Sequence, residues 1–203
     1  MNNSYRYEDA KHIYIDPKSG VLKNIAGFTD SEDLHFFESI TVSKRLNELY
    51  ENPIEINGIR SLFSIHHHLF QDVYSWAGEK RVVEISKNGK EFIPTPLFDN
   101  ALQYIDGLIT EYRQIKKNQK KKISEKLAEI LDSVNYLHPF REGNGRAQRE
   151  FIRLLALEKN YILNLNPPDK DVFERYMSGT INSDIKMLRD LIFELLIKES
   201  KAI

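Results

Sequence analysis

The sequence predicts an all-α protein that carries one small β-hairpin. Long amphipathic stretches repeat apolar residues at helical spacing. Glycine and proline, which interrupt helices, number only 9 and 7 in 203 residues. A single stretch, residues 80–96, instead combines β-prone runs with an Asn-Gly turn. The length and the 41% hydrophobic share fit one domain over residues 1–203.

The first 70 residues divide into an arm and two predicted helices. The arm, residues 1–30, lacks helical periodicity and contains a turn at IDPKSG. A helix is expected to follow TDSED, where Asp30 or Ser31 can cap the first turn, and to stop before Asn52. A second helix is predicted over residues 56–70, where apolar residues recur at helical spacing.

Residues 80–96 form the predicted hairpin. The short runs RVVEIS and EFI flank Asn88-Gly89, a dipeptide typical of two-residue hairpin turns. Pro94 and Pro96 then end the second strand. We expect a small exposed flap in an otherwise helical protein.

Helical periodicity returns after the hairpin and continues almost to the end of the chain. The basic run KKNQKKK is expected to be a solvated loop between two of these helices. The predicted helices cover residues 98–115, 122–137, 145–160, 170–180 and 184–200.

The composition narrows the classes of function. The 29 basic and 30 acidic residues leave a net charge of -1, so we expect no direct nucleic-acid partner. The chain has no cysteine, which excludes disulfides and thiolate chemistry. We expect no signal peptide and no membrane span, because no apolar stretch is long enough. These features predict a cytoplasmic protein and leave secretion into another cell open.

The segment HPFREGNGRAQRE, residues 138–150, lies between two helical patterns and is predicted to be a loop that opens into a helix N-terminus. The first N–H groups of a helix have no partner within it and, together with the helix dipole, form an anion site. Gly143 and Gly145 allow the backbone to approach a ligand closely. Asn144 adds a side-chain amide donor.

Four charged or titratable residues surround this anion site. Arg146 and Arg149 share one helix face, where each guanidinium could bind a phosphate. Glu142 is suitably placed for a Mg²⁺ ion that bridges phosphates. His138 is the one group in the cluster that titrates near neutral pH, which suits a general base. Each feature alone is common in structural loops, but the combination predicts a site that holds magnesium-bound ATP.

This segment resembles the signature of the Fic domain family, HxFx(D/E)GNGRxxR, and fills every defining position. IHHHLFQDVYSWAGEKR is similar to the segment that precedes the flap in these proteins, and DPKSGVLKN is similar to their N-terminal arm. The resemblance covers nearly the whole chain. It implies a Fic-type helical bundle with a β-hairpin flap.

The resemblance also implies an activity, the transfer of AMP from ATP to a protein hydroxyl with release of pyrophosphate. His138 would deprotonate the Ser, Thr or Tyr of the target, and Glu142 would hold Mg²⁺ between the α- and β-phosphates. The site residues that it implies for ATP are Gly143, Asn144 and Gly145 at the α- and β-phosphates, Arg146 and Arg149 at the β- and γ-phosphates, and Tyr176 and Asn182 at the adenosine.

In the family, the flap pairs with an extended segment of the target by strand addition, which places the hydroxyl over the α-phosphate. The alternative is a simple surface hairpin. The flap residues that the resemblance implies for target binding are Glu84, Ile85, Gly89, Lys90, Glu91, Phe92 and Ile93.

Many Fic proteins are restrained by a helix with the pattern [S/T]xxxE[G/N]. Glu51-Asn52 has the right pair, but Asn47 occupies the Ser/Thr position, so the chain lacks this pattern. It therefore resembles the class whose inhibitor is a separate antitoxin protein. That class would make it a bacterial toxin, with type II topoisomerase subunits as possible targets.

Two other functions remain open at this point. The same fold could carry another nucleotidyl or phosphoryl transfer, although intact Gly143 and Gly145 favour AMP. A non-catalytic domain that binds a nucleotide or a partner is the other. A metal site at His66-His67-His68 is not expected, because consecutive helical residues point about 100° apart.

Overall fold

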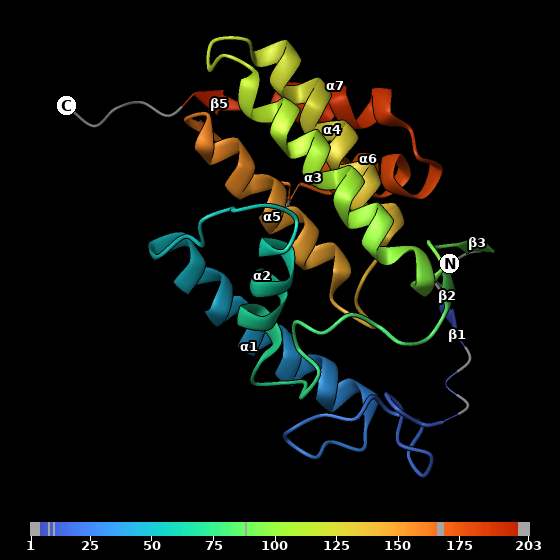
Figure 1. Ribbon diagram of the computed structural model, residues 1–203. Coiled ribbons are helices and arrows are strands. Elements are labelled where there is room, and N and C mark those ends of the chain that lie inside the picture. Colours follow the sequence, from blue (N-terminus) through green and yellow to red (C-terminus); the bar gives the residue numbers. More distant parts are fainter. Residues whose placement is uncertain (1–4, 8, 10, 88, 166–168, 199–203) are drawn as a thin grey trace.

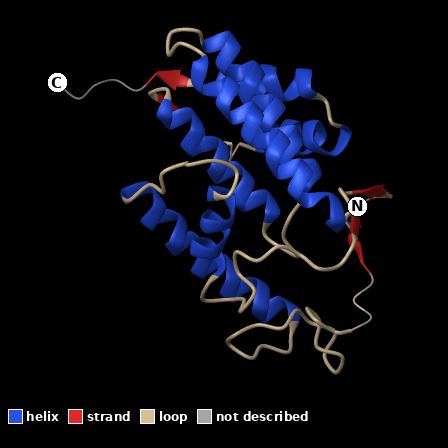
Figure 2. Ribbon diagram, viewed as in Figure 1, coloured by secondary structure: helices blue, strands red, loops and turns tan. Residues whose placement is uncertain are grey.

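The computed structural model describes residues 5–7, 9, 11–87, 89–165 and 169–198 (Figure 1). Within them the chain is helical, and its strands are short and lie at the edges of the molecule (Figure 2), which confirms the all-α prediction. The helices are α1 (Ser31–Glu51), α2 (Ser61–Phe70), α3 (Phe98–Gln114), α4 (Lys120–Leu137), α5 (Asn144–Glu158), α6 (Lys170–Asn182) and α7 (Ile185–Leu195), with a short 3₁₀ turn at Thr95–Leu97. The strands are β1 (Tyr5–Tyr7), β2 (Ile85–Lys87), β3 (Lys90–Glu91), β4 (Tyr161–Ile162) and β5 (Ile197–Lys198).

Aspartate side chains begin three of the helices. Asp30 accepts from the backbone N–H groups of Glu32 and Asp33 at the start of α1, as the sequence predicted. Asp169 caps α6 and Asp184 caps α7 in the same manner. These caps fix the starts of α1, which packs against α2, and of α6 and α7, which pack against each other.

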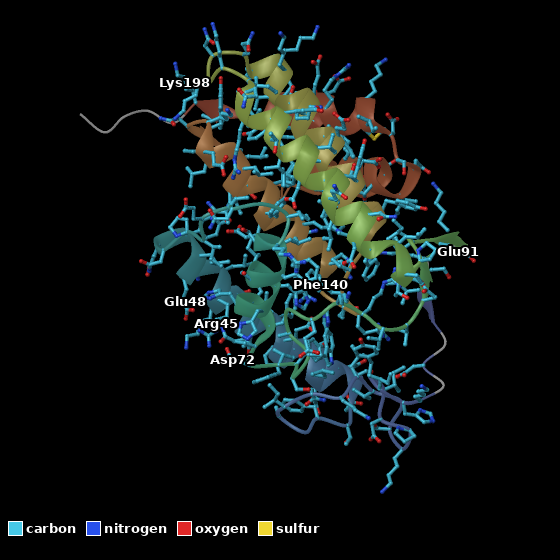
Figure 3. The ribbon with its side chains drawn as sticks, in the orientation of Figure 1. Arg45, Glu48, Asp72, Glu91, Phe140 and Lys198 are labelled. Atoms are coloured by element: carbon cyan, nitrogen blue, oxygen red, sulfur yellow. The ribbon has the colours of Figure 1, made fainter. Side chains whose placement is uncertain are left out.

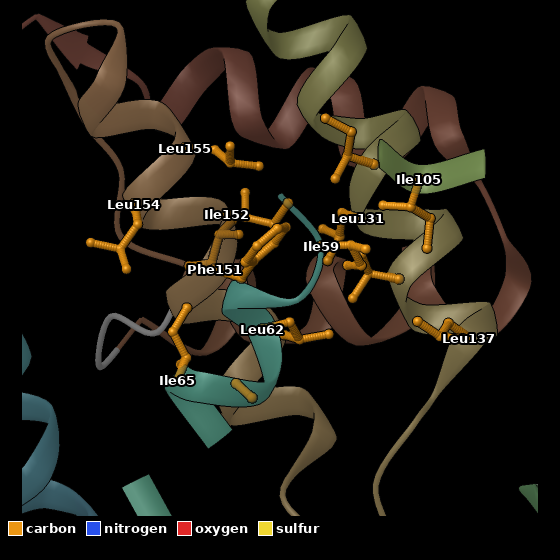
Figure 4. Packing of buried hydrophobic residues seen from close by; sticks show 14 of the residues in the cluster. Ile59, Leu62, Ile65, Ile105, Leu131, Leu137, Phe151, Ile152, Leu154 and Leu155 are labelled. Carbon is orange, nitrogen blue, oxygen red and sulfur yellow. The ribbon is translucent and has the colours of Figure 1, made fainter. Parts of the chain in front are cut away.

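Helix α5 lies at the centre of the bundle, in contact with both α2 and α4 (Figure 1). Helix α4 also packs against α3 and α7, and α6 packs against α7. Apolar side chains from α2, α3, α4 and α5 meet in one core (Figure 4). The loop between α4 and α5 is therefore held at both ends by buried helices.

The predicted hairpin is present, although residue 88 at its turn lies outside the described residues. Strands β2 and β3 pair antiparallel, with Ser86 opposite Glu91. A third strand, β1 of the arm, pairs antiparallel with the other edge of β2, and Tyr7 lies opposite Ile85. The arm therefore contributes to the flap, which the sequence did not predict.

The predicted C-terminal helix over residues 184–200 is too long. Helix α7 ends at Leu195, and Leu196 adopts an extended conformation. Ile197 and Lys198 then pair with Ile162 and Tyr161 as a second small sheet. Residues 199 and 200 lie outside the described residues.

Arg45 of α1 links this helix to Asp72, which lies just after the end of α2 (Figure 3). The Arg45 guanidinium donates to Asp72 at 2.7 and 2.9 Å and to Glu48 at 2.9 Å. This attachment holds the helix that brings Glu38 to the site described below.

Among the described residues, none of the helices has the length and apolarity that a membrane crossing needs.

Candidate active site

The loop between α4 and α5 is fixed by its own backbone and side chains. His138 ends α4 in the left-handed conformation, with φ of 40°, and Gly143 begins α5 with φ of 81°. Between them the Asn144 side chain accepts from the Phe140 N–H at 2.9 Å and donates to the Phe140 carbonyl at 2.7 Å. The side-chain amide that was expected to face a phosphate therefore braces the loop through its oxygen and one of its N–H groups.

Gly143 is required by space as well as by its φ angle. A Cβ atom at this position would lie 2.4 and 2.5 Å from the Phe70 ring and 3.1 Å from His66. The close approach brings the start of α5 onto α2. The first backbone N–H groups of α5 are thereby aimed into the site with a helix dipole behind them.

His66 supports the loop from the side of α2. The Gly78 N–H donates to Nδ1 of His66 at 2.9 Å, so Nε2 carries the hydrogen and donates to the Glu142 carbonyl at 2.9 Å. Its ring is fully buried and stacks on Phe140, which lies in the interior near the middle of Figure 3. Burial lowers its pKa to about 3. Nε2 thus supports the loop and Nδ1 supports the backbone at Gly78, and no group of three His, Cys, Asp or Glu residues in the described part of the chain could hold a metal.

His138 is a buried, neutral histidine. Its Nδ1 lies 3.1 Å from the Asn135 carbonyl, so Nδ1 carries the hydrogen and Nε2 is the basic nitrogen. Phe92 of the flap stacks on the ring, with centroids 3.7 Å apart. Burial first, and then the positive charges of Lys87 and Arg81, lower its pKa to about 3.

Arg146 and Arg149, the two arginines of α5 that were predicted to bind phosphate, lie on the expected face, and each has an aromatic neighbour. The Arg146 guanidinium stacks over Phe70, pairs with Glu38 at 2.6 Å and lies 3.6 Å from Glu142. Arg149 lies over the Tyr176 ring, 5.3 Å from its centroid. Stacking restrains both planar groups without using all of their donors.

A pocket opens between the flap, the loop and α6. Of the predicted site residues, those that line it are His138, Gly145, Arg149, Tyr176, Lys90, Glu91 and Phe92. Glu142 and Arg146 line a neighbouring hollow beside Glu38 and Tyr74. The structure thus gathers the motif around the N-terminus of α5, in two adjoining recesses.

Asn182 is not among the residues that line this pocket. It is exposed, and its amide donates to the Ser178 hydroxyl at 3.3 Å. Thr180, Ile181 and Ser183 line the pocket instead. The loose spacing between the motif and α6 did not allow the sequence to distinguish these neighbours.

The flap is anchored at its base and at its tip. Lys90 of β3 donates to the Ile181 carbonyl at 2.6 Å. Glu84 was expected to face the target, but its carboxylate accepts from Thr95 N–H and hydroxyl at 2.9 and 2.7 Å and from Arg81 at 3.1 Å. Glu84 therefore closes the base of the hairpin. The Ile85 side chain of β2 is buried, whereas Gly89 is exposed at the turn.

Three residues that contact the site were missed from the sequence, namely Glu38, His66 and Arg81. Glu38 is buried, pairs with Arg146 and accepts from the Tyr74 hydroxyl at 2.5 Å. Arg81 donates to the His138 carbonyl at 3.0 Å. The one available signal was for Arg81, which ends the WAGEKR segment directly before the hairpin.

A helical bundle in which a Gly-Asn-Gly loop and a buried histidine lie beneath a β-hairpin is the architecture that the Fic signature implied. A model of the Fic/DOC family matches residues 57–156. The chain belongs to this family.

Two curated relatives and one solved structure are similar to this chain. The chain is 32% identical over 171 residues to the protein adenylyltransferase VbhT of Bartonella schoenbuchensis, which is 84% of this chain and 36% of VbhT. It is 28% identical over 185 residues to the probable protein adenylyltransferase y4lH of Sinorhizobium fredii, covering 90% of this chain and 95% of y4lH. The chain thus spans about a third of VbhT and nearly all of y4lH. The crystal structure of BepC from Bartonella tribocorum, with bound AMPPNP, shares the fold with a TM-score of 0.81 and 22% identity, over 93% of this chain and 98% of that one.

Proposed function

We propose that this protein is an adenylyltransferase that moves AMP from ATP to a Ser, Thr or Tyr hydroxyl of a target protein. The observation that carries the proposal is that His138, Gly145 and Arg149 line one pocket at the N-terminus of α5, beneath the flap. A basic nitrogen, unpaired helix N–H groups and a guanidinium are the parts that this transfer needs. The names of VbhT and y4lH support the same activity.

In the proposed step the target hydroxyl oxygen attacks the α-phosphorus of ATP. A new P–O bond forms, the bond between the α-phosphorus and the bridging oxygen breaks, and pyrophosphate leaves. Nε2 of His138 takes the hydroxyl proton. The backbone of Gly143, Asn144 and Gly145 and the guanidinium groups of Arg146 and Arg149 bind the phosphate oxygens.

The lowered pKa of His138 fits this role when the substrate is considered. In the protein without ATP, burial and two nearby cations disfavour the imidazolium ion. The phosphates of ATP would bring several negative charges next to the ring and raise its pKa. The base would then be strongest when the substrate is present.

Glu142 is the residue that would hold Mg²⁺. Its carboxylate is about one-third exposed and accepts from the Gly143 N–H at 2.8 Å, at the start of the helix that would bind the phosphates. Mg²⁺ commonly takes one or two carboxylates and completes its shell with phosphate oxygens and water, which a lone Glu142 fits. When bound, the ion would neutralise charge on the phosphates.

The target segment would add to the flap as a strand. Strand β1 already pairs with one edge of β2, so β3, with Lys90 and Glu91, presents the edge to which no other described strand is paired. Phe92 and Ile93 continue from this edge toward His138. Of the flap residues expected from the sequence, we therefore assign target contact to residues 89–93 and a supporting role to Glu84 and Ile85.

For the adenosine we propose the recess beside Tyr176, which is buried and contacts Arg149. We retain Asn182 only as a residue near the rim of this recess. In this proposal the arm over residues 1–30, the flap over 80–96, the loop over 138–149 and the segment after 184 all belong to one domain.

We further propose a cytoplasmic toxin that is restrained by a separate antitoxin protein, with type II topoisomerase subunits as candidate targets. The support is the missing [S/T]xxxE[G/N] pattern in this chain. Expression in bacteria with and without a candidate antitoxin tests it. Unimpaired growth of cells that express the active protein alone would contradict it.

The type of transfer is tested with two labels. Bacterial lysate is incubated with the protein and either α-labelled or γ-labelled ATP. We expect label to enter protein only from α-labelled ATP. Transfer from γ-labelled ATP alone would show a kinase, and no transfer from either, with ATP bound, would show a non-catalytic binding domain.

A further inference from the structure

Arg81 is a fully buried arginine at the point where the flap meets the loop of His138. Its guanidinium lies over the Phe98 ring, 4.9 Å from the centroid, and its backbone N–H donates to the Pro139 carbonyl at 2.7 Å. The side-chain acceptors are the carbonyl of His138 at 3.0 Å, the carbonyl of Val83 at 2.6 Å, the carbonyl of Ile93 at 2.7 Å and the carboxylate of Glu84 at 3.1 Å.

These acceptors come from three different segments. Val83 precedes β2, Ile93 follows β3, and His138 starts the loop between α4 and α5. One planar group therefore ties both ends of the hairpin to the residue proposed as the base. Arginine is the one side chain with five donors in a fixed plane, so no other residue could satisfy these carbonyls together.

The buried charge of Arg81 must be offset by the hydrogen bonds that its guanidinium donates. Placing a charge in the interior is costly, and a buried ion pair can often be replaced by apolar residues with no loss of stability. The partner carboxylate, Glu84, is largely exposed, so it compensates the buried charge only in part. What the arginine provides and an apolar residue would lack is a fixed geometry between the three segments.

We propose that Arg81 is a positioning residue that sets the register of the flap against His138. A target segment that pairs with the flap would then present its hydroxyl at a fixed distance from the imidazole. This inference rests on the proposed function for its catalytic consequence, whereas its structural part concerns only the flap and the loop.

The test compares Arg81→Met and Arg81→Lys with wild type. Methionine is close in length and has no hydrogen-bond donors, whereas lysine keeps the positive charge but lacks the planar guanidinium group. Arg113→Met is the matched control, because Arg113 also donates to a carbonyl, that of Ile56, and pairs with a carboxylate, that of Glu158, away from the flap. Three quantities are measured, namely hydrogen exchange of residues 83–93, ATP affinity, and transfer of label from α-labelled ATP to lysate proteins.

For both Arg81 variants we expect at least tenfold faster exchange in the flap, at least 100-fold slower transfer, and ATP affinity within about threefold of wild type. Arg113→Met should leave flap exchange and transfer unchanged. Unchanged flap exchange in Arg81→Met would overturn the proposal. A loss of transfer that is matched by an equal loss of ATP affinity would also overturn it.

If Arg81→Met does not fold, Glu84→Ala provides the test, since its exposed side chain links Arg81 to the Thr95 end of the hairpin. Faster exchange at residues 91–95, slower transfer and unchanged ATP affinity would support the register role, and unchanged exchange there would overturn it. If wild type transfers no label at all, the proposed function fails, but the exchange measurement still decides whether Arg81 fixes the flap.

Discussion

The Phe92 ring covers the His138 imidazole, with centroids 3.7 Å apart and ring planes 15° apart. This contact joins the flap to the proposed base. It also helps to keep water from the ring and so favours its neutral form. The flap therefore has two effects on the site, since it shields the base and offers an edge to the target.

Removal of this cover should change how His138 titrates. In Phe92→Ala we expect the pKa of His138 to rise from about 3 toward the ordinary value near 6.5, because water reaches the ring. NMR titration of the imidazole resonances measures it. Phe36→Ala is the control, because Phe36 is 68% exposed on α1 and away from the ring. Identical titration in Phe92→Ala and wild type would contradict the shielding role.

Two glycine-to-alanine changes should have opposite signs. Gly143→Ala adds a methyl group into Phe70 at a positive φ, so we expect a loss of about 2–5 kcal/mol in unfolding free energy. Gly107→Ala lies in the middle of α3 with nothing within 4 Å of its new atom, so a gain of about 0.5–1 kcal/mol is expected. Urea unfolding of both variants measures the difference. A Gly143→Ala protein as stable as wild type would show that the loop does not need its contact with α2.

Stability should fall as the pH drops below about 6.5. The folded-state pKa of His66 is lowered to about 3, so the unfolded chain binds a proton in a range where the folded chain does not. The neutral ring is favoured by burial and by the nearby charges of Arg146 and His67. When the pH falls from 8 to 5, the titration of His66 should lower the free energy of unfolding by about 2 kcal/mol.

The variant His66→Gln isolates this contribution, because glutamine can still donate to the Glu142 carbonyl but does not titrate. Denaturant unfolding at pH 8 and pH 5 gives the comparison. We expect the variant to lose about 2 kcal/mol less than wild type over this interval. Equal losses in both proteins would refute a neutral buried His66.

Glu38 should matter for ATP through Arg146. Glu38→Ala removes the carboxylate that pairs with Arg146 at 2.6 Å and leaves the buried Tyr74 hydroxyl without its acceptor. We expect a stability loss of about 1–3 kcal/mol and roughly tenfold weaker ATP binding. In an Arg146→Ala background, Glu38→Ala should have no further effect on ATP binding. Tighter ATP binding in the single variant would show that Glu38 competes with the phosphates instead.

Local chemistry made much of this fold predictable from the sequence. Asp30 caps α1 as expected, β2 and β3 pair as the predicted hairpin, and the GNG segment opens onto α5. These features depend on residues that are close together in the chain. The end of α7 was missed because its continuation as β5 depends on pairing with Tyr161–Ile162, far away in the sequence.

The same reason explains what was missed at the site. Arg81 contacts a carbonyl 57 residues away, and His66 contacts one 76 residues away. The side chains of His138 and Glu142 give no sign of these contacts, because both acceptors are backbone carbonyls. Asn144 was assigned to the ligand since its residue type permits it, and only the folded loop shows that Phe140 already satisfies its amide.

The proposed transfer of AMP to protein depends on His138 as the base. The most direct measurement compares wild type with His138→Ala for label transfer from α-labelled ATP into lysate proteins, alongside ATP affinity. We predict that transfer falls by about 10²–10⁴-fold while ATP binds within about threefold of wild type. A His138→Ala protein that transfers AMP as fast as wild type would show that His138 is not the base.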